Sequence, residues 1–328
     1  MKIIMAHGSG GQATSELIDS IFAKAFDNPV LSKMEDSAVV EGAGKLAVTT
    51  DSFVVTPLFF AGGDIGRLCV CGTVNDLLMS GAVPKYLTCG FVLEEGADTQ
   101  DLERIAASMA AAAEEAGVQI VAGDTKVIEG QGGLFINTAG VGFVAETTQL
   151  SSAACREGDV VIVSGNLGDH HAAILSARMG IENTIVSDCA PLSEMVSALQ
   201  KEGVELHALR DITRGGLATV LGEFARASHC CMELWEQNIP VSEQVRGFCG
   251  ILGLDPLYMG NEGKLVAVLP ERDARRALSI LHSSRYGEYA ALIGRVSVKK
   301  RDTVLLHTPV GGLRVLGELY GEGLPRIC

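Results

Sequence analysis

The strongest constraint on the fold is the order of apolar segments, which alternate between strand-like and helix-like patterns along the chain. Short apolar runs of strand length are interspersed with longer segments whose apolar residues recur every three or four positions. In the first half, strands are predicted at 38–40, 45–50, 118–122 and 134–145, and helices at 15–26, 65–79 and 101–116. The pattern predicts a mixed α/β (α+β) fold.

A second series of the same kind begins after residues 147–158, a polar stretch of small residues where we place a domain boundary. Strands are predicted there at 159–163, 264–269, 289–296 and 303–307, and helices at 171–179, 192–202, 216–227 and 271–284. A length of 328 residues favours about two domains. We therefore expect an N-terminal domain at 1–150, a C-terminal domain at 151–314 and a flexible tail at 315–328.

Composition excludes several classes of partner. The net charge is -14, with 26 basic and 40 acidic residues and no basic stripe, so we expect no nucleic-acid partner. No apolar run reaches about 18 residues and no signal peptide is recognisable, so we expect no membrane span and a reduced, cytoplasmic protein. An acidic chain that handles phosphates needs metal ions or helix N-termini to accept them.

Acidic side chains recur beside small residues at predicted strand ends and turns. They are Asp36, Asp51, Asp76, Asp124, Asp211 and Glu262. Asp76 interrupts an apolar helix, where an ionised carboxylate is costly unless it is paired or bound to metal. Carboxylates that converge from several strand ends can hold Mg²⁺ ions on a polyphosphate. For any one of these residues alone, a cap, a turn or a solvated surface is the commoner explanation.

Glycine-rich loops are the second signal of phosphate binding. The loop 7–11 precedes a predicted helix and contains Gly8, Gly10 and Gly11. Backbone N–H groups in such a loop can surround phosphate oxygens. The loop is no Walker A motif, because the Lys-Ser/Thr pair is missing. Loops 165–171 and 211–216 are similar, and of the adjacent His170 and His171 at least one is expected to be structural.

The chain ends in Cys328, a thiol that follows Gly321, Gly323 and Pro325. A thiol on a glycine-rich arm can visit more than one site, although an ordinary disordered end would have the same pattern. Prenylation is excluded because the cysteine would have to be fourth from the end, and one thiol cannot hold zinc. The other eight cysteines lack metal-ligand spacing, so we expect small buried apolar side chains.

Taken in order, these motifs resemble the superfamily of aminoimidazole ribonucleotide synthetase, selenophosphate synthetase and thiamine monophosphate kinase. The matching segments are 7–11, 35–38, 50–51, 75–77 with 80–82, 123–125, 168–170 and 211–216. The resemblance covers nearly the whole chain. Within the superfamily, 123–127, 261–264 and the ending 325–328 resemble the hydrogenase maturation factors of the HypE family, and the ending is the most specific mark.

This resemblance implies a fold and an activity. The fold would be an N-terminal α/β domain whose sheet pairs with its copy in a homodimer, followed by a C-terminal α/β sandwich and a flexible tail. The activity would be that of an ATP-dependent carbamoyl dehydratase. A carbamoyltransferase, HypF, would load Cys328 with a carbamoyl group, which this chain would convert to a thiocyanate. The cyanide would then pass to iron on a HypC–HypD complex during [NiFe]-hydrogenase maturation.

The chemistry assigns expected roles to the motif residues. Phosphorylation turns the carboxamide oxygen into a good leaving group, and removal of an N–H proton completes the elimination. We expect Glu262 to be the base, Lys126 to stabilise charge on the transferring phosphoryl group, and His7 to be a weaker phosphate-side candidate. The expected Mg²⁺ ligands are Asp36, Asp51, Asp76, Asp124 and Asp211. The expected ATP contacts are Gly8, Gly10, Gly11, Asn75, Asp124, Thr125 and Asp211.

Two other readings stay open at this point. A sister enzyme would use the same ATP site on a free small molecule. A selenophosphate synthetase, however, would need a reactive cysteine near the first glycine loop, and the first cysteine here is Cys69, inside a predicted helix. Neither a thiamine monophosphate kinase nor a ribonucleotide cyclo-ligase would have a use for a terminal thiol. A non-catalytic scaffold presenting Cys328 to metal would need neither ATP turnover nor the recurring aspartates.

Overall fold

The first half of the chain folds around a four-stranded sheet with the strand order β1-β6-β4-β5. The computed structural model describes residues 2–8, 12–33, 38, 40–42 and 44–317. The strand pairs β1–β6 and β6–β4 are antiparallel, whereas β4–β5 is parallel. The strands are β1 (Leu46–Phe53), β4 (Val83–Glu94), β5 (Gln119–Ile128) and β6 (Leu134–Phe143); β2 (Phe59–Phe60) and β3 (Gly63–Asp64) form a separate ribbon.

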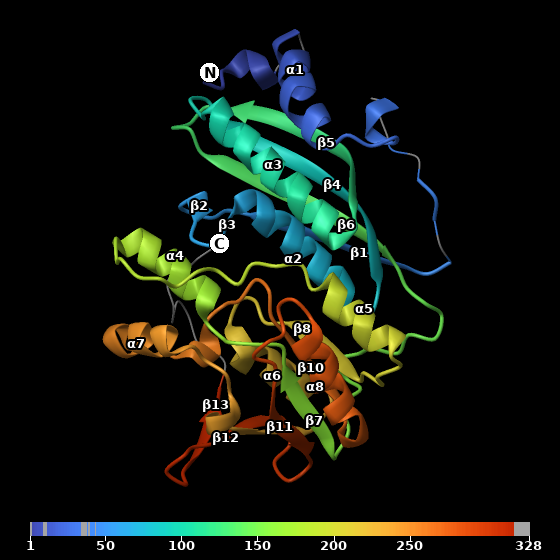
Figure 1. The fold of residues 1–328 in the computed structure, drawn as a ribbon, viewed down its shortest axis with the longest axis vertical. Helices are drawn as coiled ribbons and strands as arrows, with labels where there is room; N and C mark the ends of the chain where they lie inside the picture. The colour runs from blue at the N-terminus through green and yellow to red at the C-terminus, as the bar shows by residue number, and fades with distance from the viewer. Residues whose placement is uncertain (1, 9–11, 34–37, 39, 43, 318–328) are drawn as a thin grey trace.

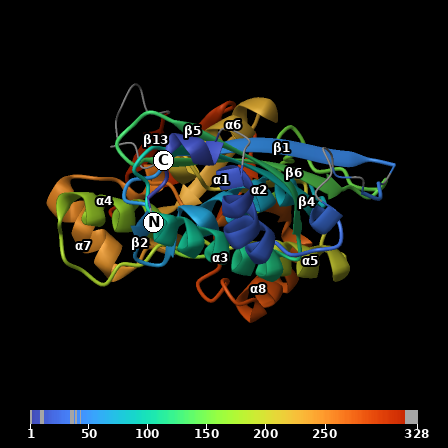
Figure 2. The same ribbon diagram turned by 90° about the horizontal axis from the view of Figure 1, so that it is seen from above.

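Two long helices cover one face of this sheet (Figures 1 and 2). They are α2 (Ile65–Met79) and α3 (Thr99–Ala116). The side chain of Asp64 caps α2 by accepting from the backbone N–H groups of Gly66 and Arg67, and α3 ends at Gly117 in the left-handed conformation. The shorter N-terminal elements are η1 (Met5–Gly8), α1 (Gln12–Leu17), η2 (Ile18–Ala23) and η3 (Leu31–Lys33).

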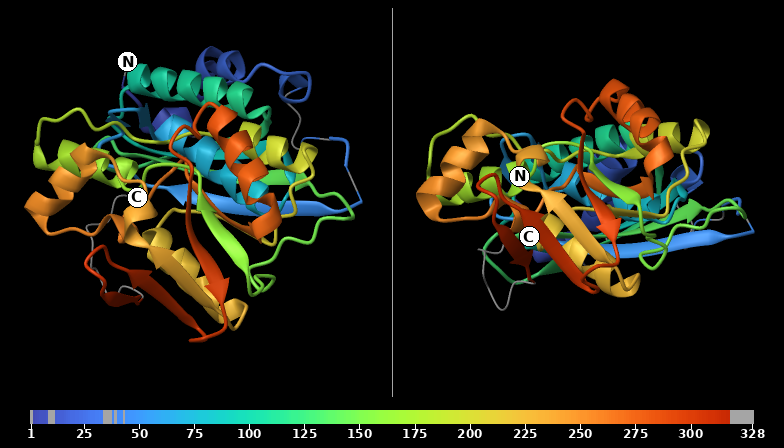
Figure 3. Two further views of the ribbon diagram at one scale, coloured as in Figure 1. Left: turned by 60° about the horizontal axis from the view of Figure 1, so that its bottom comes forward. Right: turned by 90° about the horizontal axis from the view of Figure 1, so that it is seen from below.

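The opposite face of the four-stranded sheet is left open by the residues that the structure describes. Paired strand residues point to the same side, and β1 places Leu46 and Val48 opposite Phe143 and Val141 of β6. Leu46 is 50% exposed and Val48 71% exposed. In the right-hand view of Figure 3, β1, drawn in blue, runs along the outside of the molecule.

The second half contains a seven-stranded sheet with the order β13-β12-β9-β11-β7-β10-β8. Its strands are β7 (Asp159–Val163), β8 (Ala208–Asp211), β9 (Cys231–Trp235), β10 (Leu265–Pro270), β11 (Ala291–Ser297), β12 (Thr303–His307) and β13 (Leu313–Leu316). Its helices are α4 (Asp169–Met179), α5 (Ser193–Lys201), α6 (Gly216–Ala227), α7 (Glu243–Leu252) and α8 (Ala274–Ser283), with short turns η4 (Glu236–Asn238), η5 (Pro256–Tyr258) and η6 (Glu271–Asp273).

Helix α2 is buried on all sides and lies between the two halves (Figure 1). One face packs against β1 and β6, and other residues contact β8 and α5 of the second half. A helix that is apolar all round belongs in an interior, and α2 joins a continuous apolar core that reaches from Leu68 and Val74 to Leu192 and Met195. A polar side chain on the face of α2 that meets the second half, such as Asn75, is therefore held at the junction of the halves. No helix in the described ranges is long and apolar enough to cross a membrane.

The predicted mixed α/β class is confirmed, and the differences are local. The predicted strand 38–40 is wrong, because residues 38 and 40 belong to no strand. The predicted strand 118–122 continues as β5 to Ile128, so residues 123–125 are strand and not turn. Strand β4, in which Pro84 and Gly90 interrupt the apolar pattern, was not predicted, nor were β8, β9 and α7. Strand β13 ends at Leu316, inside the segment predicted to be tail.

Candidate active site

Four predicted carboxylates line one cavity of about 730 Å³ between the two halves. They are Asp51, Asp76, Asp211 and Glu262. The cavity is also lined by Gly72, Arg178, Thr213 and Arg214. Residues separated by more than two hundred positions in the chain therefore share one site.

The first half contributes two of these carboxylates through a strand and a helix. Asp51 pairs with Thr138 across β1 and β6, and the hydroxyl of Thr138 donates to the backbone oxygen of Cys69 in α2. Asp51 therefore points to the face of the sheet that α2 covers. The Thr49 hydroxyl on the same strand donates to Oδ2 of Asp76 at 2.9 Å. The alternation of β1 and the burial of α2 thus bring Asp51 and Asp76 together.

The second half contributes Asp211 and Glu262 from neighbouring chain segments. Asp211 is the last residue of β8 and pairs with Leu265, the first residue of β10. Glu262 lies in the turn 261–264 that leads into β10. Both carboxyl side chains are buried, at 7% exposure each. The antiparallel β8–β10 pair therefore delivers both acids to the same end of the sheet.

Burial and mutual repulsion raise the proton affinity of these acids. The pKa of Asp51 rises to about 6, chiefly through burial and then through the neighbouring Asp76. The pKa of Asp211 rises to about 7 for the same two reasons. Burial, with Asp211 and Asp188 as neighbours, raises the pKa of Glu262 well above its usual range. Such a cluster calls for a positively charged ligand.

The donor set suits Mg²⁺. Carboxylate oxygens are the ligands that this ion prefers, and the cluster carries more negative charge than the nearby side chains balance. Within the described ranges, however, no three acidic, His or Cys side chains already form a compact ligand group. The residues therefore fit Mg²⁺ by chemistry, while Asp36, a further predicted ligand, lies outside the described residues.

Two arginines of the cavity were not among the predicted site residues. Arg214 is exposed in the loop between β8 and α6, and its charge lowers the pKa of Asp51, against burial and Asp76. Arg178 of α4 donates from Nε to the backbone oxygen of Thr56 at 2.5 Å. Both are suited to phosphate oxygens. Arg214 belongs to the glycine-rich loop 211–216 that the sequence singled out, whereas no local pattern marks Arg178.

Asp124, Thr125 and Lys126 lie apart from this cavity, in the middle of β5. Asp124 pairs with Gly90 of β4, and Gly90 pairs with Asn137 of β6, so Asp124 points to the open face of the sheet. Its carboxylate makes an exposed ion pair with Lys126 at 2.8 Å. Within one chain, the sheet itself separates Asp124 and Lys126 from the Asp51 cluster. Asp124 and Thr125 instead help to line a smaller cavity of about 230 Å³ beside α1 and η2.

The remaining predicted site residues have varied positions. Asn75 is buried in α2 and bonds to backbone groups of the second half. His7 is buried, and its Nδ1 accepts from the backbone N–H of Ile4. Gly8 ends η1. The other predicted residues, Gly10, Gly11, Asp36 and Cys328, lie outside the described residues.

Histidine and cysteine behave as expected where the structure describes them. His170 is buried and bonds through Nδ1 to the Ser187 hydroxyl at 2.8 Å, and His171 Nδ1 accepts from the backbone N–H of Gly260. Both have structural contacts. All eight cysteines before the tail are buried free thiols, and burial raises the pKa of the Cys89 thiol to about 12. A raised thiol pKa is the opposite of what a reactive nucleophile needs.

Comparison with known proteins places this geometry in a family. The family model "AIR synthase related protein, N-terminal domain" matches residues 34–144, and "AIR synthase related protein, C-terminal domain" matches residues 156–307. The carbamoyl dehydratase HypE of Azotobacter vinelandii is 50% identical over 332 residues, covering 100% of this chain and 97% of that protein.

Solved structures agree over the same length. The crystal structure of the hydrogenase maturation protein HypE in complex with ATP is 47% identical, with a TM-score of 0.96 and coverage of 99% of each chain. The crystal structure of a HypE–HypF complex matches with 45% identity and a TM-score of 0.81, covering 92% of this chain and 99% of that chain. The resemblance inferred from the motifs is confirmed, and the chain belongs to the HypE family of carbamoyl dehydratases.

Proposed function

We propose that this chain is an ATP-dependent carbamoyl dehydratase that converts an S-carbamoyl group on its own Cys328 to a thiocyanate. The γ-phosphoryl group of ATP would move to the carbamoyl oxygen, and loss of phosphate with two N–H protons would leave S–C≡N, with ADP and phosphate as products. The observation that supports this best is the convergence of four carboxylates and two arginines on one cavity, in a chain whose relatives share its full length.

The side chains divide into a charge-binding group and a proton-accepting group. Asp51, Asp76 and Asp211 would hold Mg²⁺, which when bound supplies positive charge to the phosphate oxygens. Arg214 would bind phosphate oxygens at the exposed side of the cavity. Glu262, buried and with a raised pKa, would accept the proton from the carbamoyl nitrogen. The glycine loop at 7–11 would add backbone contacts to ATP, as the motif predicts.

The direct test follows the mass of the C-terminal peptide. The protein is incubated with the HypF carbamoyltransferase, carbamoyl phosphate and Mg-ATP. We expect Cys328 to gain one carbamoyl group and then to lose the mass of one water only when ATP is present. An unmodified Cys328 beside an active partner would contradict the proposal and would favour a free small molecule as the substrate. Metal bound by Cys328, with neither dehydration nor ATP consumption, would favour the non-catalytic scaffold.

The partners follow from the same proposal. A HypE–HypF complex is known for a chain that is 45% identical, so we propose HypF as the donor of the carbamoyl group. A HypC–HypD iron complex would accept the cyanide. A terminal carrier thiol would let one chain serve both partners, because the group travels on the protein and never as a free molecule.

We also propose that the open face of the four-stranded sheet pairs with a second copy in a homodimer. Leu46 and Val48 are exposed there, beside the partly buried Val141 and Phe143, and together they make an apolar surface. Asp124 and Lys126 lie on the same face, so a dimer of this kind would place both at the interface. This would explain why the sequence motif at 123–127 stands apart from the cavity of its own chain.

A charge on that face is expected to separate the dimer. Val48→Asp should shift the mass in solution from twice the chain mass to one, because an unpaired carboxylate would be buried in the interface. Light scattering after size exclusion measures this mass. Val310→Asp is the matched control, since Val310 is 93% exposed at the end of the second half, and it should leave the dimer intact. A dimer that persists in Val48→Asp would place the interface elsewhere.

A further inference from the structure

The turn 261–264 presents Glu262 to the cavity. Side chains of residues far from this turn in sequence hold it in place by hydrogen bonds, and we call these contacts the grip on the turn. The backbone oxygen of Glu262 faces Nδ2 of Asn75 at 3.4 Å, and its backbone N–H donates to Oδ1 of Asp188 at 3.2 Å. Asn75 belongs to α2 in the first half, and Asp188 to the loop 180–192 in the second. Both peptide groups that flank the Glu262 side chain are therefore fixed from outside the turn.

Asn75 has no exposed surface to spare for a nucleotide, because it is 2% exposed and its amide is engaged at both ends. Besides Glu262, Nδ2 donates to the backbone oxygen of Ala190 at 3.1 Å, and Oδ1 accepts from the backbone N–H of Leu192 at 2.9 Å. One amide thus bonds to two segments of the second half at once. A buried amide with its donors and acceptor satisfied in this way specifies a single arrangement of those segments.

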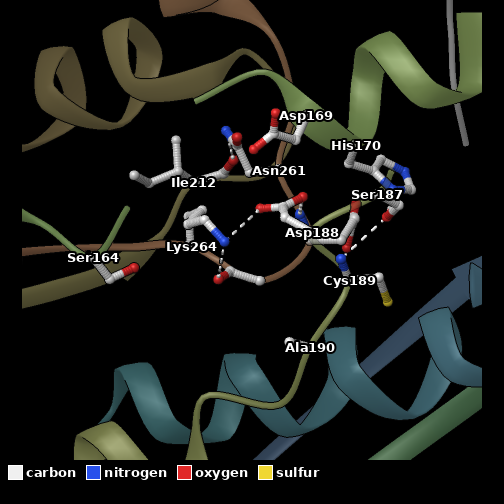
Figure 4. A network of polar contacts seen from close by, with 12 residues as sticks. Ser164, Asp169, His170, Ser187, Asp188, Cys189, Ala190, Ile212, Asn261 and Lys264 are labelled. Atoms are coloured by element: carbon white, nitrogen blue, oxygen red, sulfur yellow. Dashed lines mark hydrogen bonds and ion pairs between the residues drawn. The ribbon is translucent and has the colours of Figure 1, made fainter. Parts of the chain in front are cut away.

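Asp188 completes the grip from the other side. Its Oδ2 lies 3.4 Å from Nζ of Lys264, and both side chains are almost fully buried. Figure 4 shows Asp188 pointing toward Lys264, while the loop continues through Cys189 and Ala190. The approach is close, because a Cβ at Gly263 would stand 2.0 Å from the backbone oxygen of Asp188. The absent side chain of Gly263 is therefore what lets loop 180–192 lie directly against the turn.

Helix α2 presents three residues of the site on one face. Gly72, Asn75 and Asp76 are spaced three and four positions apart, so they share a side of the helix. A Cβ at Gly72 would lie 4.0 Å from Oε2 of Glu262, so the Glu262 carboxylate reaches the surface of this helix. Asp76 lines the same cavity. The face that supplies one carboxylate thus also fixes the position of the other.

We infer that Asn75 and Asp188 are positioning residues, which hold the Glu262 carboxylate in register with Asp76 across the junction of the two halves. The inference rests on the proposed role of Glu262 as the base. It gives Asn75 a task different from the direct ATP contact that the motif predicts. Because a shift of the base by about 1 Å can lower a rate by about a hundred-fold, loss of the grip should slow the chemical step while ATP binding persists.

The test measures single-turnover dehydration of pre-carbamoylated protein and, separately, the dissociation constant of ATP. Asn75→Ala should slow dehydration by about ten- to a hundred-fold and change the ATP dissociation constant by less than about three-fold. Gln200→Ala is the matched control: Gln200 also bridges the halves, donating to the backbone oxygen of Gly81 at 3.0 Å, but does not touch the turn. It should keep the wild-type rate. A large loss of ATP affinity in Asn75→Ala would overturn the inference in favour of a direct nucleotide contact.

A double variant separates this inference from the proposed function. If Asn75 acts through Glu262, then adding Asn75→Ala to Glu262→Gln should cause little further loss, whereas independent roles would multiply the two losses and overturn the inference. A wild-type rate in Asn75→Ala beside a slow Glu262→Gln would overturn the positioning role alone. A wild-type rate in Glu262→Gln would contradict the proposed role of Glu262 as the base. If Asn75→Ala does not fold, Asp188→Ala tests the same contacts, because it removes the acceptor of the Glu262 backbone N–H. A wild-type rate in that variant would overturn the inference.

Discussion

Glu262→Gln is expected to slow the ATP-dependent conversion of S-carbamoyl-Cys328 by on the order of 10²–10⁴-fold. Glutamine keeps the shape of the side chain and leaves the backbone contacts to Asn75 and Asp188 in place. It cannot accept the proton of the carbamoyl nitrogen. The loss should therefore appear in the rate of the chemical step, followed by the mass of the C-terminal peptide in a single turnover.

Glu288→Gln is a suitable control for this variant, because Glu288 is exposed and remote from the cavity. It should react at the wild-type rate. ATP should still bind to Glu262→Gln. Because only the dehydration step is slowed, the variant should accumulate carbamoylated Cys328 in the presence of HypF. A rate within about three-fold of the wild type would show that another group removes the proton.

Asp211→Asn is expected to have opposite effects on activity and stability. Asp211 is buried beside Asp76 and Asp51, and removal of one charge relieves their repulsion. The free energy of unfolding, measured by urea in the absence of divalent cations, should rise by about 1–2 kcal/mol at neutral pH. Dehydration should fall by at least about a hundred-fold, because the variant loses one of the carboxylates that would hold Mg²⁺.

The same comparison predicts how the stability of the metal-free protein changes with pH. The pKa of Asp211 rises from 3.8 to about 7 in the folded protein, through burial first and Asp76 second. The folded state therefore binds this proton more tightly than the unfolded state, and the associated stability is lost as the pH rises from about 4 to about 7. The metal-free wild type should lose more stability over this window than Asp211→Asn. If the free energy of unfolding changes equally with pH in the two proteins, folding does not raise the pKa of Asp211.

Local patterns were sufficient where a residue's position depends on its own neighbours in sequence. The apolar run broken by Asp76 predicted helix α2 with its observed bounds, and Gly117 ended α3 as its type suggests. Local patterns did not predict strand β4. Its residues are stabilised by pairing with β5 and β6, which are distant partners, and Pro84 and Gly90 weaken the local signal.

The sequence alone also proposed one group of aspartates, and the structure divides that group. Asp51 and Asp124 both stand on strands of the same sheet, but they point to opposite faces. In a strand the side alternates with every residue, so an error of one position in the register reverses the assignment. No local motif specifies which face a helix will cover. That choice is made when α2 and α3 pack on the sheet.

By itself, the sequence determined the mixed α/β class, the family, and the residue types of the site, because these depend on periodicity and on motifs that are contiguous in the chain. Only the tertiary structure decided which of those residues meet. Asp51, Asp76, Asp211 and Glu262 share a cavity because α2 is buried between two sheets and the β8–β10 pair brings two turns to its surface. Asn75 bonds to the second half for the same reason. The contact of Asn75 with Glu262, for example, joins residues 187 positions apart, and its energy exists only once the apolar core has brought the two segments together.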